Sequence, residues 1–202
     1  MESLRKKLGE LNRQKKLSFD EIQKLRAEFP HSIHLAEQSP AELIARLYFN
    51  CAMYAFNLRC DDLYRAIATG ESIRRRNLSR DGDKIISADT EFVEYCIKQG
   101  LVSSISNREP ESGDLVVYSD SDRCRHVGKL LDQSRVRSKW GMVDLFEHEL
   151  LEVPDFYGDN VEYFESLRFE QSQDGFIAYA KSVVEDNPQA KLLLDNTINS
   201  YT

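Results

Sequence analysis

The spacing of apolar and polar residues is helical over the first part of the chain. About the first forty residues are highly charged, with apolar side chains at helical intervals. Ser18-Phe19-Asp20-Glu21 forms a capping box in which the Ser18 hydroxyl can accept from the Glu21 N–H, and Pro30 ends that helix. Ser39-Pro40-Ala41-Glu42 predicts a second helix start, with Pro at the first helical position.

The helical pattern continues through three more segments before residue 100. Apolar residues recur at helical spacing from Leu43 and run into residues 50–56. Residues 61–70 predict a short helix, and residues 71–84 read as a surface connection. Residues 90–98 predict a further helix that ends at Gly100, with one apolar face made by Phe92, Val93, Cys96 and Ile97.

A β-like pattern then replaces the helical one. Four segments separated by turn residues predict strands: 115–118, 126–131, 134–138 and 161–169. Residues 174–202 are again helical, with a break at Asn187-Pro188. Helices followed by an antiparallel sheet predict an α+β fold. We therefore expect a helical extension at 1–45, a central domain at 46–169 and a helical tail at 170–202.

Composition and charge narrow the classes of function. The 202 residues are 41% hydrophobic and 30% charged, as in an ordinary globular protein. The formal net charge of −7 argues against general attraction to nucleic acid or to anionic membranes. The apolar runs are too short to span a bilayer, and the N-terminal residues lack the apolar region of a signal peptide. We expect a cytoplasmic protein, or one exported without a Sec signal.

Cysteine spacing bears on metal binding and redox state. Cys51, Cys60, Cys96 and Cys124 form no C-x-x-C pair and no zinc-ligand grouping with histidine. We therefore expect no structural zinc and four reduced thiols, most of them small buried apolar groups.

One set of motifs contains candidate catalytic residues. Asn50-Cys51 precedes a helical segment, Pro110 to Tyr118 leads into a strand, and His126-Val127-Gly128 follows. A helix N-terminus and a neighbouring imidazole both favour the thiolate of a cysteine. A cysteine at a helix end facing a histidine on a strand is the minimal device for acyl transfer.

These motifs resemble the papain-like cysteine hydrolases of the NlpC-type cell-wall peptidases and CHAP amidases. In those families a Cys opens a helix, P-x-x-G-D leads into a strand, and H-V-G or H-V-A opens the next strand. The chain also looks like a less characterised branch with N-C-x-x-Y-A, G-D-x-V-x-Y and S-K-x-G. The last motif is Ser138-Lys139-Trp140-Gly141 here, followed by 148–150 and 154–158.

The resemblance implies roles for particular residues. Cys51 would be the nucleophile and His126 the general base and acid, with no metal and no cofactor. The residue that orients the imidazole falls at Ser138, which we expect near His126 directly or through one water; Glu147 and His148 are the alternatives. Candidate oxyanion or substrate contacts are Asn50, Trp140 and Lys139.

Each of these residues also has a structural reading. Cys51 can be a small buried residue, and one unbroken helix over residues 41–58 would leave it without a helix end. His126 can be a strand-end histidine bonded to backbone, and Asp114 is expected to cap a turn. The basic residues between Arg123 and Lys139 pair with the acidic segment 144–165, or form a docking surface for an anionic substrate.

The function expected from this reading is hydrolysis or transfer at an amide through a thioester on Cys51. Its substrate would be a peptide, peptidoglycan or a protein, and neither nucleic acid nor membrane is an expected partner. Two other classes stay open. One is a non-catalytic papain-like binding module, and the other is a toxin-type effector or immunity component.

Overall fold

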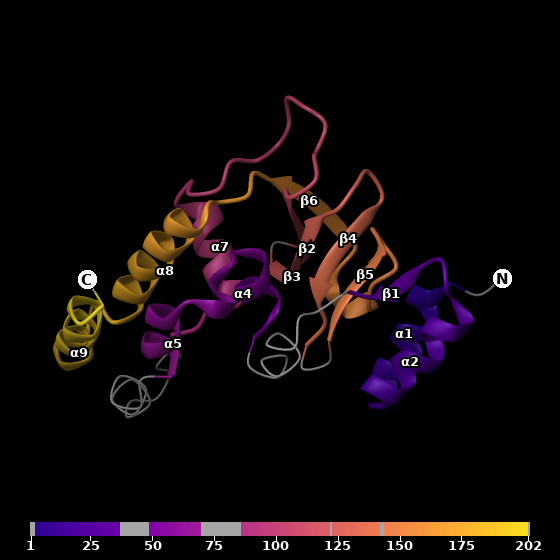
Figure 1. Ribbon diagram of the computed structural model, residues 1–202, viewed down its shortest axis with the longest axis horizontal. Coiled ribbons are helices and arrows are strands. Elements are labelled where there is room, and N and C mark those ends of the chain that lie inside the picture. Colours follow the sequence, from indigo (N-terminus) through magenta and orange to yellow (C-terminus); the bar gives the residue numbers. More distant parts are fainter. Residues whose placement is uncertain (1–2, 37–48, 70–85, 122, 142–143, 202) are drawn as a thin grey trace.

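The chain forms an α+β structure in which one antiparallel sheet has helices packed on both faces (Figure 1). The computed structural model describes residues 3–36, 49–69, 86–121, 123–141 and 144–201. In the described parts, six strands lie in the order β1-β5-β4-β3-β2-β6. Their bounds are β1 Ile33–Leu35, β2 Leu115–Asp120, β3 Arg123–Leu130, β4 Arg135–Lys139, β5 Leu145–Glu149 and β6 Asn160–Phe164.

The helices fall into an N-terminal pair and a larger group that follows β1. The pair is α1 (Leu4–Arg13) and α2 (Phe19–Glu28). The larger group comprises α4 (Cys51–Ala55), η1 (Leu58–Cys60), α5 (Asp62–Thr69), α7 (Thr90–Lys98), α8 (Phe169–Val183) and α9 (Pro188–Asn199), with a separate short turn η2 (Asp155–Tyr157) before β6. Figure 1 shows the two groups on opposite sides of the sheet.

Side chains of successive strand residues enter two separate cores, because neighbours along a strand point to opposite faces. Val117 and Val127 belong to the core under α4, α7 and α8, which we call the α4 face. Val116, Tyr118 and Leu130 belong to the core under α1 and α2, which we call the α1 face. The sheet is thus buried on both sides, and each residue of β3 is assigned to one side or the other.

Several predicted elements are confirmed. The α+β order holds, α7 spans the predicted 90–98, and the tail divides at Asn187, whose side chain accepts from the Ala190 N–H. The Ser18 hydroxyl accepts from the Glu21 N–H at 3.4 Å and caps α2. The second predicted start at 39–42 and the connection at 71–84 lie outside the described residues.

Other elements differ from the sequence pattern. β1 and β5 were not predicted; they pair with each other, with Ile33 opposite His148. β3 begins at Arg123, so His126 is inside the strand rather than at its start. β6 ends at Phe164, and Phe169 begins α8 instead of ending a strand.

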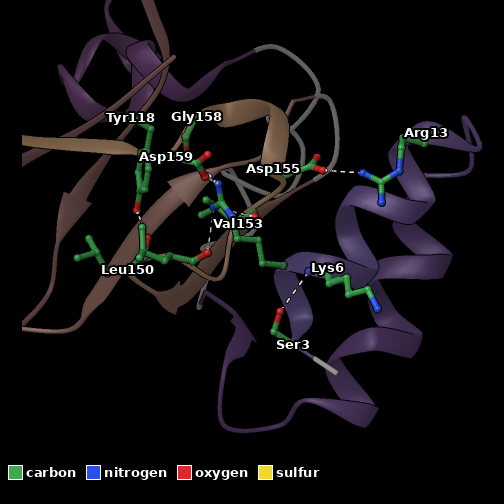
Figure 2. A network of polar contacts seen from close by, with 11 residues as sticks. Ser3, Lys6, Arg13, Tyr118, Leu150, Val153, Asp155, Gly158 and Asp159 are labelled. Carbon is green, nitrogen blue, oxygen red and sulfur yellow. Dashed lines mark hydrogen bonds and ion pairs between the residues drawn. The ribbon is translucent and has the colours of Figure 1, made fainter. Parts of the chain in front are cut away.

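The N-terminal helix α1 is tied to the loop that carries η2. The Arg5 guanidinium donates to the carbonyls of Leu151 and Gly158 at 3.0 Å and also pairs with the Asp159 carboxylate. Arg13 pairs with Asp155 at 2.9 Å, and Figure 2 shows these loop residues against α1. The segment 151–159 is therefore held to α1 by two arginines.

The backbone of this loop lies very close to β2 at Gly158. Gly158 has φ 97°, and a Cβ at this position would overlap the backbone carbonyl of Ser119. Only glycine therefore fits both the backbone angle and the space.

We expect Gly158→Ala to lower the free energy of unfolding by about 3 kcal/mol or more, since backbone strain and overlap with a fixed carbonyl add together. Gly100→Ala is the matched control: Gly100 also has a positive φ, 65°, but its side-chain direction is open. There the cost should be about 1 kcal/mol. Urea unfolding of both variants measures the difference, and equal losses would contradict the packing described for Gly158.

No helix in the described residues is long and apolar enough to cross a membrane.

Candidate active site

A helix begins at Cys51 because Asn50, directly before it, has an extended backbone and caps the helix N-terminus with its side chain. Asn50 is extended, with φ −111° and ψ −175°, and its side-chain oxygen accepts from the Met53 N–H at 2.9 Å. Its amide nitrogen donates to the Ala88 carbonyl at 2.7 Å, which anchors the cap beside the start of α7. One unbroken helix through residues 41–58 is therefore excluded, and Cys51 is the first residue of α4. As an N-cap, Asn50 has a structural role here.

The thiol of Cys51 lies against the backbone of β3. Burial raises its pKa, and the charge of Asp89 acts in the same direction. Backbone groups of Val127, Ala52 and Cys51 itself oppose the shift by favouring the thiolate. In the resting protein the balance favours the neutral thiol.

His126 is a buried histidine with an unpaired nitrogen. It is 1% exposed, and its Nε2 has no hydrogen-bond partner in the described structure. Its ring stacks on the Tyr157 ring with centroids 3.9 Å apart and planes 3° apart. Burial lowers the pKa of His126 well below the usual value, and nearby His148 adds to the shift. The ring is therefore neutral at pH 7 and can accept a proton at Nε2 in one tautomer.

Cys51 and His126 are next to the same short stretch of β3 but pack with different cores. Cys51 lies with the core of the α4 face, and the His126 ring lies against Tyr118 and Tyr157 of the α1-face core. The thiol is next to the backbone of Val127, the residue that follows His126. Tyr157 stacks on the imidazole from the α1 face. Within the described residues, no hydrogen bond joins Cys51 to His126.

The direct hydrogen bond expected between Ser138 and His126 is not made in the described structure. Its hydroxyl instead lies 2.8 Å from His148 Nε2 and accepts from Trp140 Nε1 at 3.1 Å. His148 Nδ1 is 2.9 Å from the Glu149 carbonyl, which can only accept. The proton of His148 is therefore on Nδ1, and Nε2 accepts from Ser138. The sequence did not reveal this chain because β5 was not predicted.

The remaining candidates have other partners. Glu147 pairs with Arg137, whose Nε donates at 3.0 Å, as expected for a basic strand facing an acidic one. Lys139 is fully buried, donates to the Gly141 carbonyl at 2.9 Å and lies 5.2 Å from the centre of the Phe49 ring. Trp140 is buried in the core of the α1 face.

Two further predictions concern structural residues. Asp114 accepts from the Glu111 N–H at 2.7 Å and pairs with Arg108, so it stabilises the turn before β2 as expected. Cys96 and Cys124 are buried, whereas Cys60 is exposed; all are free thiols. The sequence pattern did not indicate a role for Tyr157, although this residue lies in the segment 154–158 named above.

The family match covers the segment that contains this site. Residues 45–165 match the model of the domain of unknown function DUF7689, which is more than half of the chain. The chain belongs to the DUF7689 family. Cys51, His126 and Tyr157 all lie inside the matched segment, while α1, α2, α8 and α9 lie outside it. No curated protein and no solved structure matches the chain.

The described residues contain no group of three or more His, Cys, Asp or Glu side chains placed to hold a metal ion.

The buried histidines make stability depend on pH. Burial lowers the pKa of His148 from 6.5 to about 4. The unfolded chain binds this proton at a higher pH than the folded protein does, so the stabilisation is complete above pH 6.5 and is lost as the pH falls toward 4. For His148 alone the loss approaches about 3 kcal/mol, and His126 acts in the same direction.

We expect the free energy of unfolding to decline between pH 6.5 and 4, and the decline to be shallower in His148→Gln. The glutamine amide can still bond Ser138 but does not titrate. Denaturant unfolding at a series of pH values measures both slopes. Parallel curves for the two proteins would show that His148 does not resist protonation in the folded state.

Proposed function

We propose that this protein is a papain-like cysteine hydrolase or acyltransferase that acts on an amide through a thioester on Cys51, with His126 as general base and acid. The observation that supports the proposal concerns the surroundings of Cys51 and His126. Cys51 opens α4 against the backbone at Val127. His126, the residue before Val127, holds a buried Nε2 without a partner in the described structure, and its ring lies on the α1 face. A buried nitrogen left unpaired costs free energy, so such a group is a candidate for function.

The chemical steps follow from these two groups. The imidazole takes the proton of the thiol as sulfur attacks the carbonyl carbon, and an S–C bond forms. The C–N bond then breaks, and the imidazolium returns the proton to the departing amine. Water, or an acceptor amine in the case of a transferase, attacks the thioester and releases Cys51.

The electrostatics of the site favour a particular order of proton transfer. Burial raises the pKa of the thiol and lowers that of the imidazole, so both groups rest in their neutral forms. The proton should therefore move during attack rather than before it. Backbone N–H groups near the thiol are candidates to stabilise the oxyanion that forms.

The architecture is compatible with the papain-like proposal. A short helix opened by a cysteine packs on an antiparallel sheet whose β3 carries the histidine (Figure 1). The order of Cys51, the strand pair β2–β3 and S-K-x-G along the chain agrees with the resemblance. The third residue of the family pattern is not supplied by Ser138, since His148 engages its hydroxyl. We propose that Tyr157 orients the imidazole instead, by stacking on it.

A second candidate function is a non-catalytic papain-like binding module. It is favoured by the lack of a hydrogen bond between Cys51 and His126 in the described structure. The same two pKa shifts would then reflect burial alone. The reactivity of the thiol separates the two functions.

Alkylation by iodoacetamide tests the Cys51–His126 pair. An isolated thiol reacts as thiolate, so its rate rises about tenfold per pH unit below its pKa. If His126 takes the proton during attack, the Cys51 rate should stay nearly flat from about pH 5.5 to 8, because the lowered pKa of His126 keeps its base form available. Peptide mapping by mass spectrometry follows each cysteine separately.

Two comparisons make this test specific. The exposed Cys60 serves as the internal reference for an unassisted thiol. His126→Gln should lower the Cys51 rate at pH 6 by at least tenfold and restore the tenfold slope, with Cys60 unchanged. If Cys51 follows the slope of Cys60 in the wild type, or if His126→Gln leaves its rate unchanged, the hydrolase proposal fails and the binding module is favoured.

A further inference from the structure

A polar groove lies between α7, the start of β3 and the C-terminal half of α8. Its volume is about 800 Å³, which is within the range of small-ligand sites. One face of α7 supplies Glu91, Glu94 and Lys98, and the opposite wall includes Arg123 and Arg125 from β3. The groove is thus lined by charges of both signs.

The charges on α7 are separated along the groove. Glu91 lies in the first turn of the helix and Lys98 in the last, and seven residues of helix span about 10 Å. Glu94, between them, accepts from the Cys124 N–H at 3.0 Å and is therefore engaged by the protein. Arg125 is only loosely paired with Asp120, at 3.6 Å, and both side chains are largely exposed. Along α7 the groove has an acidic end at Glu91 and a basic end at Lys98, and Arg123 and Arg125 flank the point where Cys124 bonds Glu94 between these ends.

Tyr179 adds an unpaired group to this groove. The residue lines the groove, is 4% exposed, and its hydroxyl has no hydrogen-bond partner among the described residues. Burial raises the pKa of the Tyr179 phenol, and the negative charges of Asp89 and Glu91 raise this pKa further. The hydroxyl therefore belongs to the acidic end, where an acceptor oxygen suits an ammonium group.

The acidic end of the groove is also the end that lies near the segment carrying Cys51. Cys124 lines the groove, whereas Cys51 does not. Asp89 directly precedes the groove residue Thr90, and its charge raises the pKa of the Cys51 thiol. Asn50, the residue before Cys51, bonds the Ala88 carbonyl, so the start of α4 lies beside the start of α7 where the groove residues Thr90 and Glu91 are found.

We propose that this groove binds a short zwitterionic peptide, with its ammonium group at Glu91 and Tyr179 and its carboxylate at Lys98. An extended chain advances about 3.3–3.6 Å per residue, so three residues span the distance between the two ends. The inference deepens the proposed function, because it names short peptides as the substrate class, and it rests on that function for the catalytic step alone.

Binding of trialanine to the full chain tests the inference by isothermal titration calorimetry. The capped forms are N-acetyl-trialanine, which lacks the ammonium group, and trialanine amide, which lacks the carboxylate. We expect trialanine to bind at least tenfold more tightly than either form.

Three variants assign the two ends. Glu91→Gln should abolish the preference for the free amine and leave the preference for the free carboxylate, and Tyr179→Phe should weaken the first preference alone. Lys98→Gln should abolish the preference for the carboxylate. Lys191→Gln, an exposed lysine on α9, removes the same charge away from the groove and should change neither preference.

The outcomes separate this inference from the proposed function. Equal affinity for the three peptides, or a loss in Lys191→Gln equal to that in Lys98→Gln, would overturn the groove assignment even if Cys51 shows assisted alkylation. Selective binding of trialanine with the expected variant effects would support the groove even if Cys51 reacts as an ordinary thiol, in which case only the hydrolase proposal fails.

Discussion

The stack of the Tyr157 ring on the His126 imidazole joins three parts of the molecule at one point. His126 comes from the middle of β3, Tyr157 from η2, and the loop around η2 is held to α1 by Arg5 and Arg13. A parallel contact at 3.9 Å restricts the imidazole to one plane without using either ring nitrogen. The stack therefore fixes the ring while leaving Nε2 open for a proton.

This arrangement gives the N-terminal helices a role beyond covering the sheet. α1 packs so closely on η2 that a Cβ at Gly9 would overlap the Asp155 carboxylate, the partner of Arg13. β1 also completes the sheet edge by pairing with β5, which carries His148. The segment outside the family match thus supports the site, because it holds both the loop of Tyr157 and the strand next to Ser138.

Local signals in the sequence predicted the parts of the site that depend on neighbours in the chain. Asn50 before Cys51 indicated a helix start, and this was predictable because its side chain caps the helix by accepting from the Met53 N–H, only three residues away. The partner of Ser138 was not predictable in the same way, since His148 lies on a strand of mixed polarity, β5, which is brought next to Ser138 by its pairing with β4. The stacking of Tyr157 depends equally on long-range packing, and no local pattern shows it.

If Cys51 and His126 act as a pair, the ring nitrogens of His126 report on the pairing directly. In ¹⁵N NMR spectra assigned with His126→Gln, we expect a neutral His126 ring from pH 8 to at least pH 5. We also expect carbamidomethylation of Cys51 to shift the Nε2 resonance. An Nε2 resonance that does not move after complete modification of Cys51, or a ring that becomes protonated near pH 6.5, would show that the two residues do not act as a pair.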